Sequence, residues 1–107
     1  MAFRVIVAAS AVHDIDDIHV FISQNTGAIA ADRVIDALEK RIATLAVLPR
    51  RGNVPKELAA TGRKDFRELH FKPYRIFYKV SVSVVEVVAV LDGRRDMSTL
   101  LRQRLTR

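Results

Sequence analysis

The links between three strand-like segments in the second half of the chain constrain its fold more than any other feature. Phe66–Phe71, Tyr74–Val80 and Val84–Leu91 are rich in β-branched and aromatic residues, and only two or three residues separate one from the next. A parallel pair of strands needs a crossover of about a dozen residues or more, so links this short allow only antiparallel pairing. The segment 66–91 is therefore predicted to form a three-stranded antiparallel meander.

The first half of the chain predicts one strand followed by two helices. Phe3–Ala8 is a short β-branched run and is predicted to be a strand. Apolar residues at spacings of three and four then indicate a helix that starts at an N-cap on Ser10, and a second helix over Ala28–Leu48. Gly27 suits the left-handed cap between them, and Pro49 stops the second helix. The short link predicts an antiparallel hairpin that packs on a sheet.

A basic loop and a short terminal helix complete the predicted fold. Arg50–Lys64 contains proline and glycine and is predicted to be an ordered but irregular loop. Asp96 or Ser98 is predicted to cap a final helix that carries three leucines. The expected class is α+β, with one domain over residues 1–107: an N-terminal strand, an antiparallel helical hairpin packed on a sheet, the three-strand meander that completes this sheet, and a short C-terminal helix.

The last two predicted strands are apolar on both faces. In Tyr74–Val80, Ile76 and Tyr78 lie on one face, while Phe77 is apolar on the other. Val84–Leu91 is apolar throughout apart from Glu86. A half-solvated antiparallel strand alternates between apolar and polar residues, and the hairpin can cover only one face. We therefore expect either the C-terminal segment or a partner chain on the second face.

Composition limits the class of protein further. Half of the 107 residues are hydrophobic, which excludes intrinsic disorder and allows one core. The chain has no cysteine, which excludes disulfides and thiolate metal sites and favours the cytoplasm. No apolar run approaches the length of a membrane span, so we expect neither a membrane segment nor a signal peptide at Met1.

Charge divides the chain into two parts. Residues 1–49 have four basic and six acidic side chains, for a net charge of −2, whereas residues 50–107 have fourteen and six, for a net charge of +8. A basic half of this kind attracts polyanions or an acidic protein partner. The alternative is that its arginines and lysines only solvate the exposed faces of strands and turns.

Four motifs follow one another through the second half of the chain. They are Leu48-Pro49-x-x-Gly52, Asp65-Phe66-Arg67-Glu68-Leu69, Tyr74-Arg75-Ile76-x-Tyr78-x-Val80 and Val88-x-Val90-Leu91-Asp92-Gly93-Arg94-Arg95-Asp96. This ordered set resembles the RelE/ParE family of type II toxins, whose layout of strand, two helices, three strands and basic C-terminal half is similar to that of the whole chain. The resemblance implies a growth-inhibiting toxin of a plasmid-stabilisation module that a cognate antitoxin neutralises.

The resemblance also indicates how the antitoxin binds. Antitoxins of this family are commonly acidic, and their C-terminal segment wraps the toxin, adding to its sheet or filling an apolar groove. This is consistent with strands that are apolar on both faces. A dimer and a toxin–antitoxin hetero-oligomer both remain open. The residues expected to bind the antitoxin are Phe77, Val85, Val87, Leu100 and Leu101.

The family divides by target. RelE-like members cleave mRNA on the ribosome, whereas ParE-like members poison DNA gyrase and are not known to act as nucleases. Cleavage through the 2′-hydroxyl requires a base, a proton donor and cations for the developing phosphorane charge. Arg94 and Arg95 resemble the RelE-like arginine position, but Met97–Leu101 lies where those members place a Tyr or His. His70 lies where they carry a catalytic arginine.

The incomplete acid–base set favours a ParE-like toxin that acts by binding. His70, Arg94 and Arg95 are the catalytic candidates only for the RelE-like alternative, and His70 can equally be an inert exposed histidine. A third reading is an inactive member that binds its antitoxin and operator DNA. No cofactor or metal is expected, since two ligands such as His13 and Asp17 do not make a site. The residues expected to bind the target, DNA gyrase or alternatively the ribosome and mRNA, are Arg67, Lys72, Tyr74, Arg75, Arg94 and Arg95.

Overall fold

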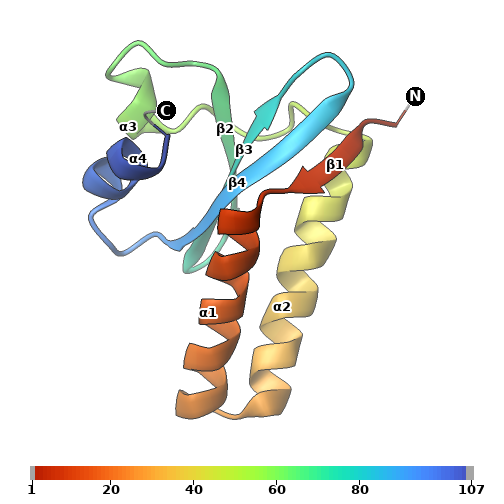
Figure 1. Ribbon diagram of the computed structural model, residues 1–107, viewed down its shortest axis with the longest axis vertical. Coiled ribbons are helices and arrows are strands. Elements are labelled where there is room, and N and C mark those ends of the chain that lie inside the picture. The colour runs from red at the N-terminus through yellow and green to blue at the C-terminus, as the bar shows by residue number, and fades with distance from the viewer. Residues whose placement is uncertain (1, 106–107) are drawn as a thin grey trace.

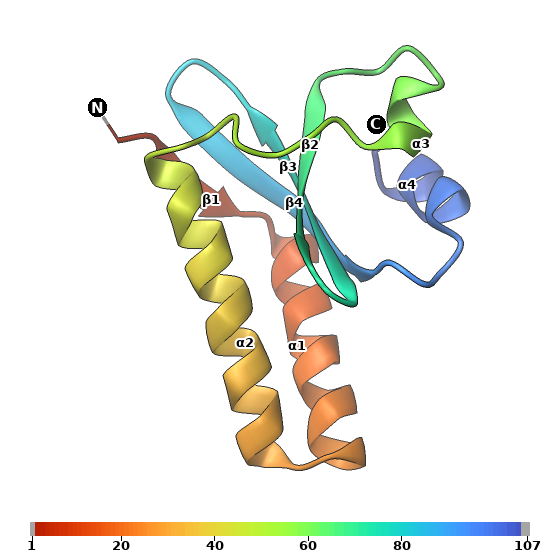
Figure 2. The ribbon, with the colours of Figure 1, turned by 180° about the vertical axis from the view of Figure 1, so that it is seen from behind.

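The computed structural model describes residues 2–105 and shows a sheet with helices on both faces (Figures 1 and 2). A long helical hairpin covers one face, and two short helices cover the other. The α+β class and the predicted order of elements are confirmed. The elements are β1 (Arg4–Val7), α1 (Ala9–Asn25), α2 (Ala28–Ala43), the 3-10 turn η1 (Thr44–Ala46), α3 (Lys56–Ala59), β2 (Phe66–Phe71), β3 (Tyr74–Val80), β4 (Val84–Asp92) and α4 (Met97–Leu105).

The sheet has the strand order β1-β4-β3-β2, so β1 and β2 are its edges. β2, β3 and β4 form the predicted antiparallel meander, and β1 pairs with β4 in the parallel direction. The register of β3 and β4 shifts beside Phe77, which pairs with Ala89 while Tyr78 pairs with Val87. Val88 is therefore an extra residue on β4, as in a β-bulge.

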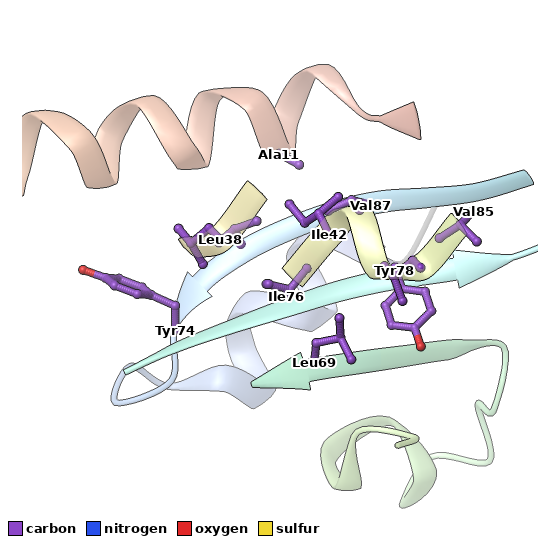
Figure 3. Packing of buried hydrophobic residues seen from close by; sticks show 11 residues of the cluster. Ala11, Leu38, Ile42, Leu69, Tyr74, Ile76, Tyr78, Val85 and Val87 are labelled. Atoms are coloured by element: carbon purple, nitrogen blue, oxygen red, sulfur yellow. The ribbon is translucent and has the colours of Figure 1, made fainter. Parts of the chain in front are cut away.

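The first core lies between the sheet and the helical hairpin. Ile76, Tyr78 and Val87 point from the sheet toward Leu38 and Ile42 of α2, and Figure 3 shows these side chains in one layer. Because side chains alternate along a strand, the apolar positions of β3 that face the hairpin are two residues apart. The apolar stripe of each helix is buried against them, which holds the hairpin on the sheet.

The second core lies on the opposite face and is covered by α3 and α4. Phe77 and Leu91 of the sheet pack there with Leu58 of α3 and with Met97 and Leu101 of α4. The bulge at Val88 turns two successive residues of β4 toward this face. Of the two coverings expected for the second face, the structure shows the C-terminal segment of the chain itself.

This arrangement corrects the expected antitoxin contacts. Phe77, Val85, Val87 and Leu101 are at most 1% exposed, so they belong to the two cores and present no surface to a partner in this structure. They are apolar because the sheet is covered on both faces by its own helices. Only Leu100 is partly exposed, and its contact with an antitoxin stays a prediction.

Several predicted boundaries also change. Ser10 is not the N-cap of α1, because the helix begins directly after β1 and Ala8 is its N-cap. The α-helix of α2 ends at Ala43 and continues as η1, earlier than predicted, and the predicted loop contains the short helix α3. The Asp96 cap is confirmed, since its carboxylate accepts a hydrogen bond from the backbone N–H of Thr99 at 3.2 Å. Gly27 is the N-cap of α2, and its φ of +122° is one that other residues rarely adopt.

Two kinds of feature are absent from the described part of the chain. No helix within residues 2–105 is long and apolar enough to cross a membrane. No three His, Cys, Asp or Glu side chains of the same residues are grouped in a way that could hold a metal ion.

Candidate functional site

Four of the predicted target-binding residues lie together at one end of the sheet. Lys72 and Tyr74 lie at the β2–β3 turn, and Arg94 and Arg95 follow the end of β4. The backbone joins the two segments, because the N–H of Gly93 donates to the carbonyl of Pro73 at 2.7 Å. We call Lys72, Tyr74, Arg94 and Arg95 the sheet-end cluster.

The cations of the sheet-end cluster are open to solvent. Lys72, Arg94 and Arg95 are exposed. Arg94 donates to both carboxylate oxygens of Asp92, at 3.0 and 2.6 Å, and this guanidinium lowers the pKa of the Asp92 carboxyl. Within residues 2–105 no ion pair involves the side chains of Lys72 and Arg95. The cluster therefore offers positive charge to a binding partner.

An apolar cavity of about 240 Å³ lies beside the sheet-end cluster. Tyr74 and Leu91 line it from the sheet and Phe21 and Asp17 from α1, and Arg95 lines it from the segment after β4. Tyr74 is buried, and its burial and the nearby Asp92 raise the pKa of its hydroxyl. Phe21 is 62% exposed, which is unusual for a residue of its size. This end of the molecule can therefore contact a partner through apolar and charged groups together.

Arg75 has a different environment from the sheet-end arginines. Its guanidinium lies between two carboxylates: it donates to Glu57 at 2.8 and 2.9 Å and to Glu68 at 2.6 and 3.0 Å. The hydrogen bonds from Arg75 lower the pKa of Glu57 to about 2, and those carboxylates raise the pKa of Arg75. Because both its charge and its hydrogen-bond donors are used within the fold, Arg75 is a structural residue.

His70 lies beside the same ion pairs. Its Nε2 atom is 3.2 Å from the Glu68 carboxylate, which is only 2% exposed, while the imidazole is 54% exposed. Both residues line a cavity of about 280 Å³ together with Asn53 and Lys56. An imidazole held by a carboxylate can transfer a proton. However, the one arginine of this cavity is already neutralised by two carboxylates and is not free to stabilise a phosphorane.

Arg67 lies on the other face of the sheet from Arg75. Its Nη1 donates to the carbonyl of Gly52 at 2.7 Å, and the N–H of Gly52 donates to the hydroxyl of Tyr78 at 2.9 Å. These bonds hold the segment after α2 against the sheet, and burial raises the pKa of the Tyr78 hydroxyl. The predicted target-binding set is therefore divided: four residues form one cluster, and Arg67 and Arg75 bind the protein's own backbone and carboxylates.

Sequence reasoning missed the partners of Arg75. Glu57 lies in the segment that was predicted to be an irregular loop, and so does Asn53, whose side-chain amide donates to the Glu68 carboxylate at 3.0 Å. Glu68 carries the signal that was available, because a carboxylate on a strand must be paired if it is buried. Its partners could not be predicted, because they are set by the register of β2 and β3, in which Glu68 lies opposite Phe77, and by the position of the short helix α3.

A second apolar groove lies at the opposite edge of the sheet. It has a volume of about 460 Å³ and is lined by β1, α1 and α2. β1 is an edge strand, with β4 on one side only. Asp16 and Glu39 stand among the apolar side chains of the groove, which are Val5, Val7, Val12, Ile15, Ile35 and Ile42.

Solved structures share this arrangement. One chain of the chromosomal ParDE toxin–antitoxin system from P. aeruginosa aligns with a TM-score of 0.70 and 15% identity, over 83% of this chain and 94% of its own. A mutant of the E. coli toxin RelE in the free state aligns with a TM-score of 0.66 and 17% identity, over 98% and 96%. The fold is therefore that of the ParE and RelE toxins.

The sequence comparisons give the family. The family model described as the ParE toxin of the type II toxin–antitoxin system parDE matches residues 5–97. Toxin ParE3 of Caulobacter vibrioides is 26% identical over 98 residues, which cover 92% of this chain and 94% of that protein. The chain belongs to the ParE toxin family of type II toxin–antitoxin systems.

Proposed function

We propose that this chain is a toxin that inhibits growth in the cytoplasm by binding and poisoning DNA gyrase, and that a cognate antitoxin neutralises it. The family supports the toxin, and the state of Arg75 supports binding over nuclease chemistry. Arg75 is held by Glu57 and Glu68, so the arginine of the cavity that His70, the only histidine of the basic half, lines is already neutralised. An arginine that is held in this way is not free to stabilise the charge that develops on an RNA phosphate during cleavage.

The sheet-end cluster is the surface that we propose for the target. Arg95 of this cluster lines an apolar cavity together with Tyr74 and the exposed Phe21. Aromatic residues and arginine are the types that carry most of the energy of protein interfaces. Arg94 and Arg95 are therefore expected to be the main charged contacts with the target.

The groove beside β1 is the surface that we propose for the antitoxin. An extended segment can pair with the free edge of β1 and place apolar side chains in the groove. Asp16 and Glu39 would bind a basic side chain of that segment. The acidic residues expected elsewhere in the antitoxin would face the basic half of the toxin.

A second candidate function rests on the pair formed by His70 and Glu68. Its geometry suits a general base, and with Arg94 and Arg95 it would make the chain an mRNA endonuclease of the RelE type. The remaining alternative is an inactive member that only binds its antitoxin and regulates its own operon. Each alternative predicts a different result in the same cells.

Expression without the antitoxin tests these functions together. We expect growth arrest with intact mRNA by primer extension, and purified toxin is expected to trap cleaved plasmid in the presence of gyrase. Arg94→Ala with Arg95→Ala is expected to abolish the arrest while the protein still binds its antitoxin. Cuts at codon positions in translating mRNA would establish the endonuclease, and growth without arrest would establish the inactive member. Full toxicity of the double variant would exclude the sheet-end arginines.

A further inference from the structure

A basic cavity lies between the C-terminal half of α2 and the end of β2. It has a volume of about 310 Å³, and we call its residues the α2–β2 pocket: Ala37, Lys40, Arg41, Thr44, Arg51 and Phe71. The three cations come from both halves of the chain, since Lys40 and Arg41 belong to the acidic half and Arg51 to the basic half. Only folding brings them together. We propose that the α2–β2 pocket binds the phosphate backbone of duplex DNA.

None of the acidic side chains of α2 lines the α2–β2 pocket. Asp32 is turned toward α1, where it accepts a hydrogen bond from His19 at 2.9 Å, and Glu39 lines the groove beside β1. Lys40 and Arg41 lie on the side that faces β2. No ion pair within residues 2–105 involves the side chains of Lys40, Arg41 and Arg51. The lining of the pocket therefore has three positive charges and no carboxylate.

The two arginines of the pocket are held in place without losing their charge. Arg41 donates to the carbonyl of His70 at 2.6 Å, and its guanidinium lies 5.5 Å from the centre of the Phe71 ring. Arg51 donates to the hydroxyl of Thr44 at 2.9 Å. Each of these bonds uses one of the five N–H donors of a guanidinium, so the others remain for an anion. Ordered arginines of this kind bind phosphate oxygens with a smaller loss of side-chain entropy.

Phe71 decides which nucleic acid the pocket fits. One face of its ring is covered by Arg41, and the ring packs against the first core. The ring is therefore already in contact with Arg41 and the core, which leaves it a poor platform for the stacking of an unpaired base that recognition of single-stranded RNA or DNA uses. Cations that meet only phosphates suit a duplex, whose bases are already paired. This proposal goes beyond the gyrase proposal, since it concerns DNA itself and a surface distinct from the sheet-end cluster.

Salt-dependent binding to DNA without gyrase tests the proposal. Binding to a labelled duplex of about 20 base pairs is measured by fluorescence anisotropy across about 50 to 200 mM KCl. The logarithm of the binding constant falls linearly with the logarithm of the salt concentration, and each phosphate contact contributes about 0.9 to the steepness of that slope. In Lys40→Gln with Arg41→Gln and Arg51→Gln, the slope is expected to fall by about 2 to 3. The dissociation constant at the lowest salt is expected to rise at least about tenfold.

Two further variants keep the test independent of folding and of net charge. Arg4→Gln with Lys64→Gln and Lys79→Gln removes the same charge from exposed positions outside the pocket and is expected to keep the parent slope. Lys40→Glu with Arg51→Glu leaves the packing of Arg41 on Phe71 intact and is expected to weaken binding even more. The proposal is wrong if the pocket variants bind like the parent, if the control loses as much, or if single-stranded RNA binds more tightly than the duplex. Because gyrase is absent, none of these results depends on the gyrase proposal.

Discussion

The ion pairs around Arg75 predict a specific dependence of stability on pH. In the folded protein the pKa of Glu57 is about 2, against an ordinary value of 4.5, chiefly because the carboxylate accepts hydrogen bonds from Arg75. At about 1.4 kcal/mol for each pH unit, this difference contributes about 3 kcal/mol to the free energy of unfolding. Because the folded-state pKa lies below the unfolded value, the contribution is complete above pH 4.5 and disappears as the pH falls toward 2.

Glu57→Gln isolates this contribution. Urea denaturation at pH 7 is expected to show a variant less stable than the parent by about 2 to 3 kcal/mol, with the difference reduced to about 1 kcal/mol at pH 3. Other carboxylates titrate in both proteins and cancel from the comparison. Glu39→Gln, at an exposed position of α2 outside this network, is expected to have little effect at any pH. If the difference in unfolding free energy between Glu57→Gln and the parent stays constant from pH 7 to pH 3, the stabilisation does not come from the charge of Glu57.

Three further substitutions test contacts that position the site. Tyr78→Phe leaves the buried N–H of Gly52 without its acceptor and is expected to cost about 1 to 3 kcal/mol by urea denaturation, whereas an unchanged midpoint would contradict that hydrogen bond. Gly52→Ala would place a methyl group against the carbonyl of Glu68, and we expect about 1 to 3 kcal/mol of destabilisation in the same assay. Stability equal to that of the parent would mean that the segment around Gly52 is not held closely against β2. Arg104→Gln removes two hydrogen bonds to Asp14, at 3.0 and 2.8 Å. It is expected to lower the free energy of unfolding by about 1 to 2 kcal/mol and to speed hydrogen exchange in α4. Unchanged exchange would show that this pair does not hold the helix.

Local patterns were enough to predict the strands. β2 and β3 match their predicted bounds, and β4 differs by one residue, because glycine, proline and short polar links limit each run. Helix ends were less predictable. Ser10 has the chemistry of an N-cap, but the tertiary structure begins the helix at Ala9, and the hydroxyl of Ser10 donates to the carbonyl of Val88 instead. The bulge at Val88 likewise depends on pairing with β3, which no local pattern specifies.

The candidate site was only partly predictable for the same reason. Arg94 and Arg95 lie where the motif after the last strand placed them, at the exposed end of the sheet. Arg75 is in the same family motif, but its partner Glu57 lies 18 residues away on a helix that the sequence did not predict. Lys40 and Arg41 belong to the acidic half of the chain. Because the net charge was compared between the two halves of the sequence, the helical hairpin was not expected to take part in binding.

The most direct test of the proposed function compares three purified proteins with gyrase and supercoiled plasmid. The parent is expected to trap cleaved DNA, Arg94→Ala with Arg95→Ala is expected to trap none, and His70→Gln is expected to act like the parent because binding requires no proton transfer. His70 is 54% exposed, so its replacement is not expected to disturb the fold. Intact plasmid with the parent protein, or the loss of activity in His70→Gln alone, would contradict a toxin that acts by binding gyrase.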